Sequence, residues 1–294
     1  MLAASLTILL CFISALSKVI LKKGLTESSP IVAMALSLIV GFVVLSFIAI
    51  PHMALHGVSH ISLQGVLVFA GIGVIAPPVV RYLSYIGIHR LGASKADPIR
   101  SSQPFFAIFL GILVFQEVLT WKILVATILI FIGILNISLR GRQTTRYQDY
   151  ARWDVLFPLG AAVIAGAITV TKKIGMDLMP DSIVGAYITT ISALLTFSIF
   201  LTLRKRWSEI RCPRRSFYFL LASGILASMT DILDLLVLKM GKISIIAPLL
   251  STTPLFVLLL SHLFLKTEEK ITARVWMGTG FVIAAVQLLF WESL

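Results

Sequence analysis

The sequence contains few charged residues, and acidic ones are the scarcest. Charged side chains make up 13% of the 294 residues, and only 13 residues are Asp or Glu. Ordinary soluble domains carry roughly a quarter charged residues. Hydrophobic residues account for 58% of the chain, and no polar stretch is long enough to form a domain outside a membrane. The composition therefore excludes a soluble globular protein and argues against an enzyme with a soluble substrate.

The sequence also lacks the motifs that bind nucleotides or metals. It has no Walker-type phosphate-binding loop. Its two cysteines, Cys11 in an apolar run and Cys212 in a basic loop, do not suggest a disulfide. His52, His56 and His60 recur every four residues, as metal ligands on one helix face would, but no carboxylate or cysteine accompanies them. We therefore expect no metal and no cofactor, with energy supplied by a gradient or by exchange.

Long apolar runs fill most of the chain instead. A helix crosses the hydrocarbon of a bilayer with about 20 apolar residues, and about ten runs of that kind are joined by short loops. The first run lacks the positively charged start of a signal peptide, so we interpret it as a spanning helix. The expected helices cover residues 2–21, 30–50, 64–88, 96–116, 121–139, 155–172, 183–203, 217–238, 243–265 and 274–291.

The two halves of the chain resemble each other. Five features recur in the same order about 150 positions later, which indicates duplication. Lys22-Lys23 matches Lys172-Lys173, Pro30 matches Pro180, Pro98 matches Pro248, Pro104 matches Pro254, and Glu117 to Thr120 matches Glu269 to Thr272. Because each half has an odd number of helices, the second half must enter the membrane upside down relative to the first. We therefore predict an all-α integral membrane protein of ten transmembrane helices in two inverted five-helix repeats, residues 1–140 and 155–294, joined by a basic linker, residues 141–154.

Basic residues are distributed unequally between the two sides of the membrane. The net charge is +12, but most cations flank apolar runs, where they contact lipid phosphates, so we expect no nucleic-acid partner. Loops on the side opposite the N-terminus hold 17 Lys and Arg residues, against five on the N-terminal side. Those five are Lys122, Lys172, Lys173, Lys239 and Lys242. Because cytoplasmic loops carry the excess positive charge, both termini are predicted to lie outside the cytoplasm.

Five charged residues inside the expected helices are the best functional candidates. Each costs at least ~2.5–3.5 kcal/mol at the centre of a bilayer, so such residues usually mark substrate or ion pathways. They are Arg81 in the third helix, Asp97 and Arg100 in the fourth, and Asp231 and Asp234 in the eighth. Arg81 and Asp231 occupy equivalent positions in the two halves.

Arg81 and Arg100 are candidates for binding an anionic group of a substrate. Prolines interrupt the backbone beside both arginines, and irregular backbone within a membrane must line protein or a water-filled cavity. A guanidinium group in such a cavity binds a carboxylate or a phosphate. The alternative is that both arginines neutralise Asp97, pack the helices or extend to lipid headgroups.

Polar tracts precede a proline at equivalent positions of the fourth and ninth helices. Their hydroxyl and amide groups can hydrogen-bond a substrate, or they can satisfy backbone groups that the prolines leave without partners. A neighbouring tyrosine adds an aromatic group, although tyrosines at such positions more often pack against other helices. The expected substrate-binding residues here are Ser101, Ser102, Gln103, Thr252, Thr253 and Tyr85.

Asp231 and Asp234, together with Asp97, are candidates for coupling transport to protons. Asp231 and Asp234 are one helical turn apart, and two carboxylates in a low dielectric rarely both ionise, so one of them is expected to take up a proton. One alternative is that Asp234 faces Lys239 or interfacial water. Another is that the two carboxylates hold a cationic or zwitterionic substrate.

One stretch of each half carries a family resemblance. The first reads LGASKADPIRSSQPFFAIFLGILVFQEVLTWKILVATILIFIGIL, with landmarks at Gly92, Pro104, Glu117, Thr120, Ala126 and Gly133. The second half repeats these landmarks at Gly241, Pro254, Glu269, Thr272, Gly278 and Ala285. With them the chain resembles the EamA-domain transporters of the drug/metabolite transporter superfamily, although its first helix lacks the Trp-Gly pair that many members carry.

The resemblance implies secondary-active transport by alternating access, with the fourth and ninth helices lining a central cavity. It also implies termini inside the cell, against the charge count. We expect export of a small polar metabolite across the cytoplasmic membrane, bound between the third, fourth, eighth and ninth helices, with protons as the candidate coupling ion. Two other functions stay open: a flippase or membrane enzyme acting on a lipid-linked head group, and a non-transporting membrane scaffold.

Overall fold

The computed structural model describes residues 2–24, 28–57, 61–80, 83, 86, 99–100, 102–138, 152–207, 210, 212–265 and 273–292, which form helices and no strands. The α-helices are α1 Leu2–Gly24, α2 Pro30–His56, α3 Leu63–Ile75, α6 Gln103–Phe115, α7 Trp121–Ser138, α8 Leu156–Leu178, α9 Ser182–Leu203, α10 Arg214–Met240, α11 Ile243–Leu250, α12 Thr253–Leu265 and α13 Ala273–Glu292. The π-helical turn η1, Ala76–Val80, follows α3, and the 3₁₀ turn η2, Arg152–Val155, precedes α8.

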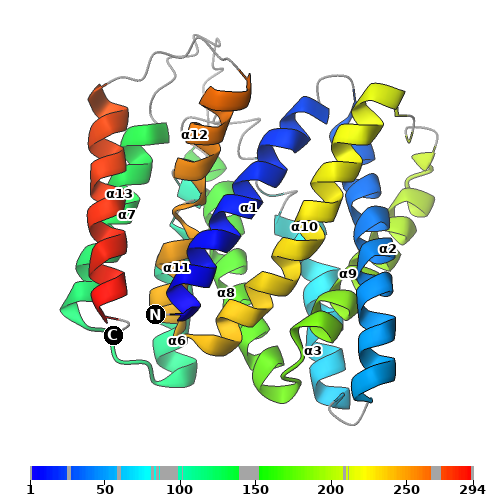
Figure 1. Ribbon diagram of the computed structural model, residues 1–294, viewed down its shortest axis with the longest axis horizontal. Helices are drawn as coiled ribbons and strands as arrows, with labels where there is room; N and C mark the ends of the chain where they lie inside the picture. Colours follow the sequence, from blue (N-terminus) through cyan, green and yellow to red (C-terminus); the bar gives the residue numbers. More distant parts are fainter. Residues whose placement is uncertain are drawn as a thin grey trace.

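The described helices follow the order of the predicted segments. Five of them, α1, α2, α8, α9 and α10, are long and apolar enough to cross a membrane, and the remaining apolar helices are shorter. Two predicted segments are interrupted, because the third continues from α3 into η1 and the ninth is divided into α11 and α12. Both ends of the chain lie at the same end of the bundle (Figure 1).

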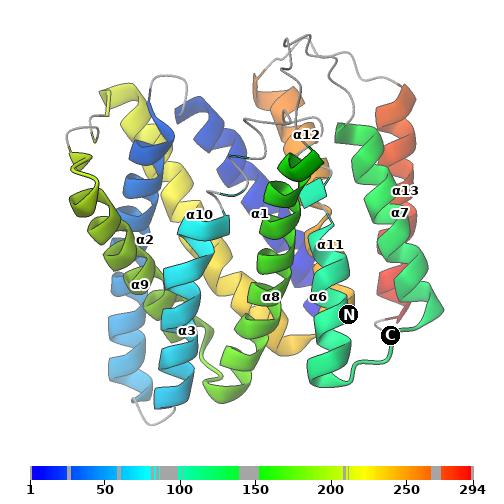
Figure 2. The ribbon, with the colours of Figure 1, turned by 180° about the vertical axis from the view of Figure 1, so that it is seen from behind.

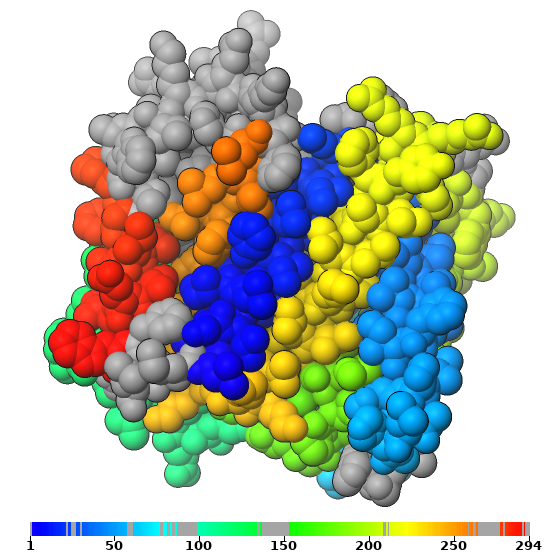
Figure 3. Space-filling model, viewed as in Figure 1, coloured from blue at the N-terminus to red at the C-terminus, as the bar shows by residue number. Residues whose placement is uncertain are grey.

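Helices of one half pack against helices of the other. α1 lies along α10 (Figure 1), and α3 lies against α8 (Figure 2), which is the equivalent pair when the two halves are exchanged. α2 packs against α9, and α7 packs against α13, so the second helices meet each other and the fifth helices do the same. Figure 3 shows α1, α10 and α2 side by side across one face. The halves are therefore interleaved in one bundle.

Small residues allow these helices to approach closely. A Cβ atom added at Gly73 of α3 would overlap the carbonyl oxygen of Thr189 on α9. A Cβ atom added at Gly133 of α7 would lie 2.7 Å from the carbonyl oxygen of Gly278 on α13. Within a membrane, helix association depends on such close packing because lipid tails are as apolar as leucine. These glycines therefore fix where the two halves touch.

The backbone is interrupted in the same way in both halves. The carbonyl oxygen of Ile99 accepts hydrogen bonds from the N–H of Ser102 at 3.1 Å and from its hydroxyl at 2.6 Å. The carbonyl oxygen of Leu249 accepts them from the N–H of Thr252 at 3.0 Å and from its hydroxyl at 2.8 Å. A proline occupies the first turn of the helix that follows each break, Pro104 in α6 and Pro254 in α12. We call these two interruptions the helix breaks.

Glu117 joins the two halves at the end of α6. Its carboxylate accepts hydrogen bonds from the backbone N–H groups of Ile243 and Ser244, both at 2.8 Å, and so caps the start of α11. Lys173 of α8 donates to the same carboxylate at 3.0 Å and to the carbonyl oxygen of Gly241 at 3.0 Å. Burial would raise the pKa of Glu117, but the bonds from Ser244, Ile243 and Lys173 outweigh it, so its pKa is lower than usual.

The structure corrects the predicted end of the sixth helix. The sequence placed Lys172 and Lys173 in a loop on the N-terminal side, whereas both lie within α8, which continues to Leu178. The apolar run ends near Lys172, but both lysines have carboxylate partners inside the bundle and the helix therefore continues. Of the five basic residues counted on the N-terminal side, three then remain there: Lys122 at the start of α7, Lys239 in the last turn of α10, and Lys242 between α10 and α11.

Replacing Glu117 with Gln should destabilise the protein. The Glu117→Gln variant keeps the shape of the side chain but removes the charge that Lys173 and the start of α11 bind, at a cost of about 1–3 kcal/mol. The melting midpoint in detergent should therefore fall at neutral pH. Because the pKa of Glu117 is lowered by folding, this contribution is present above its unfolded pKa and disappears as the pH falls through its folded pKa. The two midpoints should converge in acid, and equal midpoints at neutral pH would contradict the capping role.

Candidate functional site

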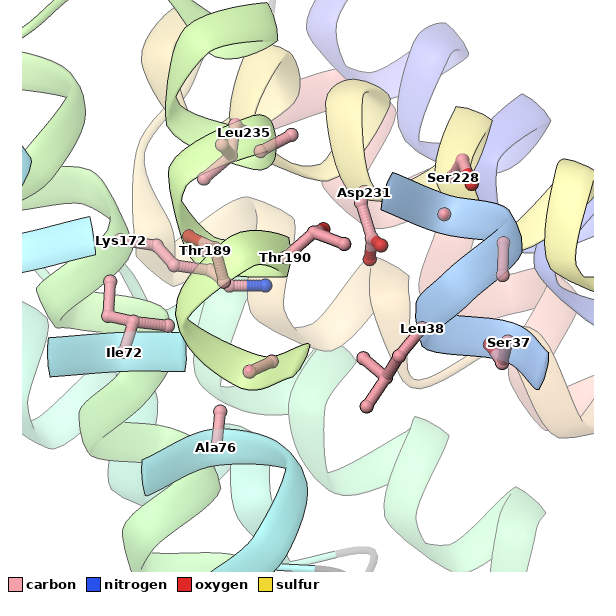
Figure 4. Close-up of a pocket in the computed structure, with 14 residues that line it drawn as sticks. Ser37, Leu38, Ile72, Ala76, Lys172, Thr189, Thr190, Ser228, Asp231 and Leu235 are labelled. Atoms are coloured by element: carbon pink, nitrogen blue, oxygen red, sulfur yellow. The ribbon is translucent and has the colours of Figure 1, made fainter. Parts of the chain in front are cut away.

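A cavity of about 170 Å³ lies among α2, α3, η1, α8, α9 and α10. Both halves line the cavity: α2, α3 and η1 belong to the first half, and α8, α9 and α10 belong to the second. Its lining is apolar apart from hydroxyl groups and two charged side chains (Figure 4). The residues that line it are Ser37, Leu38, Gly41, Ile72, Ala76, Lys172, Ala186, Thr189, Thr190, Ala193, Ala227, Ser228, Asp231 and Leu235. We call it the charged cavity.

Lys172 and Asp231 enter the charged cavity from opposite sides (Figure 4). Lys172 comes from α8, and its ammonium group forms an ion pair of 2.6 Å with Asp234 of α10. Asp231 precedes Asp234 by one turn of α10, and its charge also acts on Lys172. One ammonium group therefore faces two carboxylates. Such a group of three can exchange a proton or rearrange its ion pairs without leaving the membrane interior.

Two of the four hydroxyl groups in the cavity wall, those of Thr189 and Ser228, bond backbone. Thr189 donates to the carbonyl oxygens of Gly185 at 2.9 Å and Phe69 at 3.3 Å. Ser228 donates to the carbonyl oxygen of Gly224 at 2.8 Å. These bonds satisfy side chains that would otherwise be unpaired away from water. The charged residues are therefore the groups in this cavity that are best suited to bind or release an ion.

Four of the predicted substrate-binding residues lie at or beside the helix breaks. Ser102 and Thr252 bond the broken backbone as described above, and Thr253 donates to the carbonyl oxygen of Leu250 at 2.7 Å. Gln103 donates to the hydroxyl of Thr169 on α8 at 3.5 Å. In this state the three hydroxyls therefore satisfy backbone groups.

The structure describes only some of the remaining predicted site residues. Arg100 is exposed and lies within the helix break of the first half, between Ile99 and Ser102. Asp231 and Asp234 meet Lys172, as described above. Arg81, Tyr85, Asp97 and Ser101 lie outside the described residues. The structure thus joins the two predicted coupling carboxylates to a lysine.

Lys172 is the site residue that the sequence reasoning missed. It was counted as a loop residue because the apolar run ends beside it. One alternative placed Asp234 opposite Lys239 or interfacial water, but Asp234 pairs with Lys172 and Lys239 donates to the carbonyl oxygen of Pro180 at 2.8 Å. The available signal was that the five charged candidates inside the expected helices comprise three carboxylates but only two arginines, since buried carboxylates require a cationic partner.

The histidines after the second helix make a local contact. His52 near the end of α2 lies 2.9 Å from Asp181, whose other carboxylate oxygen caps α9. The rings of His52 and His56 are 4.5 Å apart, and His60 lies outside the described residues. Within the described ranges, no group of three His, Cys, Asp or Glu side chains is arranged to hold a metal ion.

Comparison with known proteins places this arrangement in a family. The EamA-like transporter family matches residues 1–139 and 152–291, which correspond to the two halves. A crystal structure resembles the chain with a TM-score of 0.75 and 15% sequence identity, covering 99% of this chain and 96% of the other. No curated protein matches the chain. The chain therefore belongs to the EamA-like transporter family of the drug/metabolite transporter superfamily and is a multi-pass membrane protein.

Proposed function

We propose that this protein is a secondary transporter that exports a small polar metabolite across the cytoplasmic membrane. Its ten transmembrane helices would form two inverted five-helix repeats that alternate between two open states. The paired helix breaks carry this proposal, because Ile99 with Ser102 and Leu249 with Thr252 repeat one hydrogen-bond pattern in both halves. Discontinuous helices at equivalent positions of two halves are typical of transporter binding sites.

The substrate would bind between the third, fourth, eighth and ninth predicted helices. Support comes from the helix breaks, where Ser102 and Thr252 lie, and from Arg100 within the first break. The proposed substrate-binding residues stay those predicted from the sequence: Arg81, Arg100, Ser101, Ser102, Gln103, Thr252, Thr253 and Tyr85. Substrate binding would exchange some of the hydroxyl–backbone bonds for bonds to the ligand.

Protons would be the coupling ion, carried by Asp231 and Asp234, with Asp97 as a further candidate. The supporting observation is that Lys172 faces both Asp231 and Asp234 at the charged cavity. Adding a proton to one carboxylate would weaken the hold of α10 on Lys172 of α8. Loss of the proton would restore it. Each transport cycle could in this way link protonation to the movement of α8 relative to α10.

Both termini would lie outside the cytoplasm. Moving Lys172 and Lys173 from a loop into α8 leaves three basic residues at the loops and helix ends of the N-terminal side. The asymmetry of basic residues is therefore larger than the sequence suggested. Short loops follow the positive-inside rule best, so the opposite side is proposed to face the cytoplasm.

A panel of metabolites tests the transport function. A compound that binds the folded protein should raise its melting midpoint, and the same compound should then cross the membrane of proteoliposomes that contain the protein. Transport should depend on pH in the parent protein between about pH 5.5 and about pH 7.5 if a group inside the membrane exchanges protons.

Replacing Asp231 with Asn should remove this pH dependence, because the amide cannot exchange a proton. Asp177, an exposed carboxylate near the end of α8, supplies the matched control, and Asp177→Asn should behave like the parent. The same pH profile in Asp231→Asn and in the parent would rule out Asp231 as the coupling group.

Cys212 reports the orientation directly. It lies in the loop between α9 and α10, at the end of the bundle opposite both termini (Figure 1). In the Cys11→Ser variant it is the single cysteine. A membrane-impermeant maleimide should label it only after cells are lysed. His56 is exposed at the other end of the bundle. A His56→Cys variant that lacks the native cysteines should therefore be labelled on intact cells. Labelling of Cys212 on intact cells, and of the His56→Cys variant only after lysis, would place the termini inside the cell.

A further inference from the structure

A groove of about 410 Å³ opens on the outer surface between α1, α12 and α13. α1 packs along α10 and α12, whereas α13 packs along α7. α12 therefore lies between α1 and α13 on this face (Figure 3). The groove is lined by Ser5, Ile8, Thr252, Leu255, Phe256, Val282, Ile283, Val286 and Gln287. We call it the lateral groove.

The floor and the inner end of the lateral groove are closed by packed side chains. Leu255 of α12 is buried with Val282 of α13, and Val286 packs against both. Phe256 meets Phe12 of α1 edge to face, with ring centroids 6.1 Å apart. The groove is therefore a shaped depression in the wall of the bundle and not a passage through it.

The open side of the lateral groove faces the lipid. Leu9 of α1 and Ile283 of α13 flank it, with 47% and 52% of their surfaces exposed, and in a membrane such side chains contact acyl chains. Trp291 is 70% exposed and lies one turn beyond Gln287 towards the end of α13. Because tryptophan rings prefer the level of the headgroups, the groove runs from near that level towards Thr252 at the second helix break.

The polar groups of the lateral groove gather at its headgroup end. Ser5 lies near the start of α1 and Gln287 near the end of α13, and these two helix ends lie at the same end of the bundle (Figure 1). The deeper lining is apolar apart from Thr252, whose hydroxyl already donates to the carbonyl oxygen of Leu249 at 2.8 Å. The groove therefore has the polarity of a phospholipid, with polar ester groups at the headgroup end and an apolar chain below them.

The amide group of Gln287 is available to a ligand. Its side chain is exposed, and no other described residue hydrogen-bonds it. An amide without a partner is costly where water is scarce. Its NH₂ group can donate to the ester carbonyl of a lipid, which supplies an acceptor at this depth of the membrane.

We propose that the lateral groove binds one phospholipid, with an acyl chain along Ile8, Leu255 and Phe256 and an ester carbonyl on the amide of Gln287. The volume of the groove falls within the range of small-molecule sites, about 300–1,000 Å³, so it can hold one chain while the rest of the lipid stays in the bilayer. The bound chain would cover Thr252 and so border the second helix break. This site requires only that the chain crosses a membrane, and it does not depend on the transport function.

Photo-crosslinking of the parent protein tests the site. The probe is a phosphatidylethanolamine that carries a diazirine in the middle of one acyl chain, added to the purified protein in phospholipid nanodiscs. Peptide mass spectrometry should place crosslinks on the groove residues of α12 and α13 at a severalfold higher yield than on Ile39 and Val43, which are exposed on α2. Equal yields at the two places would make the groove ordinary lipid-facing surface and would overturn the site.

Filling the groove gives a second measurement. Ile283→Trp places a larger side chain in the groove, whereas Ile39→Trp makes the same change at an exposed position outside it. In native mass spectrometry, Ile283→Trp should weaken phospholipid binding by about tenfold or more, and Ile39→Trp should bind like the parent. Gln287→Leu removes only the amide and should also weaken binding, so it supplies the test if Ile283→Trp does not fold. Binding that is unchanged in the variants at residues 283 and 287 would contradict the proposal.

Two other occupants would each overturn the lipid site. If a compound that the protein transports prevents crosslinking of the lipid probe, the groove belongs to the substrate. If the groove residues crosslink to a second copy of the chain and are shielded from the lipid probe, the groove is a dimer interface. Neither result contradicts the proposed transport function, which the metabolite panel tests separately.

Discussion

Every backbone carbonyl inside a bilayer needs a donor from the protein, because lipid tails offer none. An unbroken helix meets this requirement by itself, whereas α6 and the α11–α12 segment start or divide beside a proline. The hydroxyls of Ser102 and Thr252 bond the carbonyl oxygens of Ile99 and Leu249. These two short bonds allow irregular backbone at equivalent places in both halves. Arg100 lies within the first of these breaks, whereas Lys172 and Asp231 line a separate cavity among α2, α3, η1, α8, α9 and α10.

The lysines within the bundle divide between structural and functional positions. Lys173 is held by Glu117, which also caps α11, so it ties α6, α8 and α11 into one unit. Lys172, its neighbour in sequence, faces two carboxylates at a cavity and can change partners. Adjacent positions of one helix thus point to different environments, one that fixes the packing of the halves and one suited to an exchange of protons.

Hydropathy predicted the order of the helices, and the prolines indicated where backbone groups would lose their partners, because both signals are local in the sequence. The breaks themselves fall within segments predicted as continuous helices. The partners of the inner lysines could not be found in this way. Lys173 and Glu117 are 56 positions apart, and Lys172 and Asp234 are 62 apart, so only the packing of different helices brings them together. The end of the sixth helix was predicted too early for the same reason. Lys172 and Lys173 end the apolar run in the sequence, but carboxylate partners inside the bundle allow the helix to continue to Leu178. For the polar tracts, the sequence left substrate and backbone as alternative partners of Ser102 and Thr252. In the state described, both hydroxyls bond backbone.

Alternating access by two similar halves is tested most directly by measuring distances at both ends of the bundle in one sample. Spin labels at residues 56 and 177 report the end that carries the termini, and labels at residues 23 and 204 report the opposite end, each pair in a chain without native cysteines. A change of pH, or the addition of a stabilising metabolite, should lengthen one distance and shorten the other. Distances that stay constant, or that change in the same direction at both ends, would contradict the mechanism.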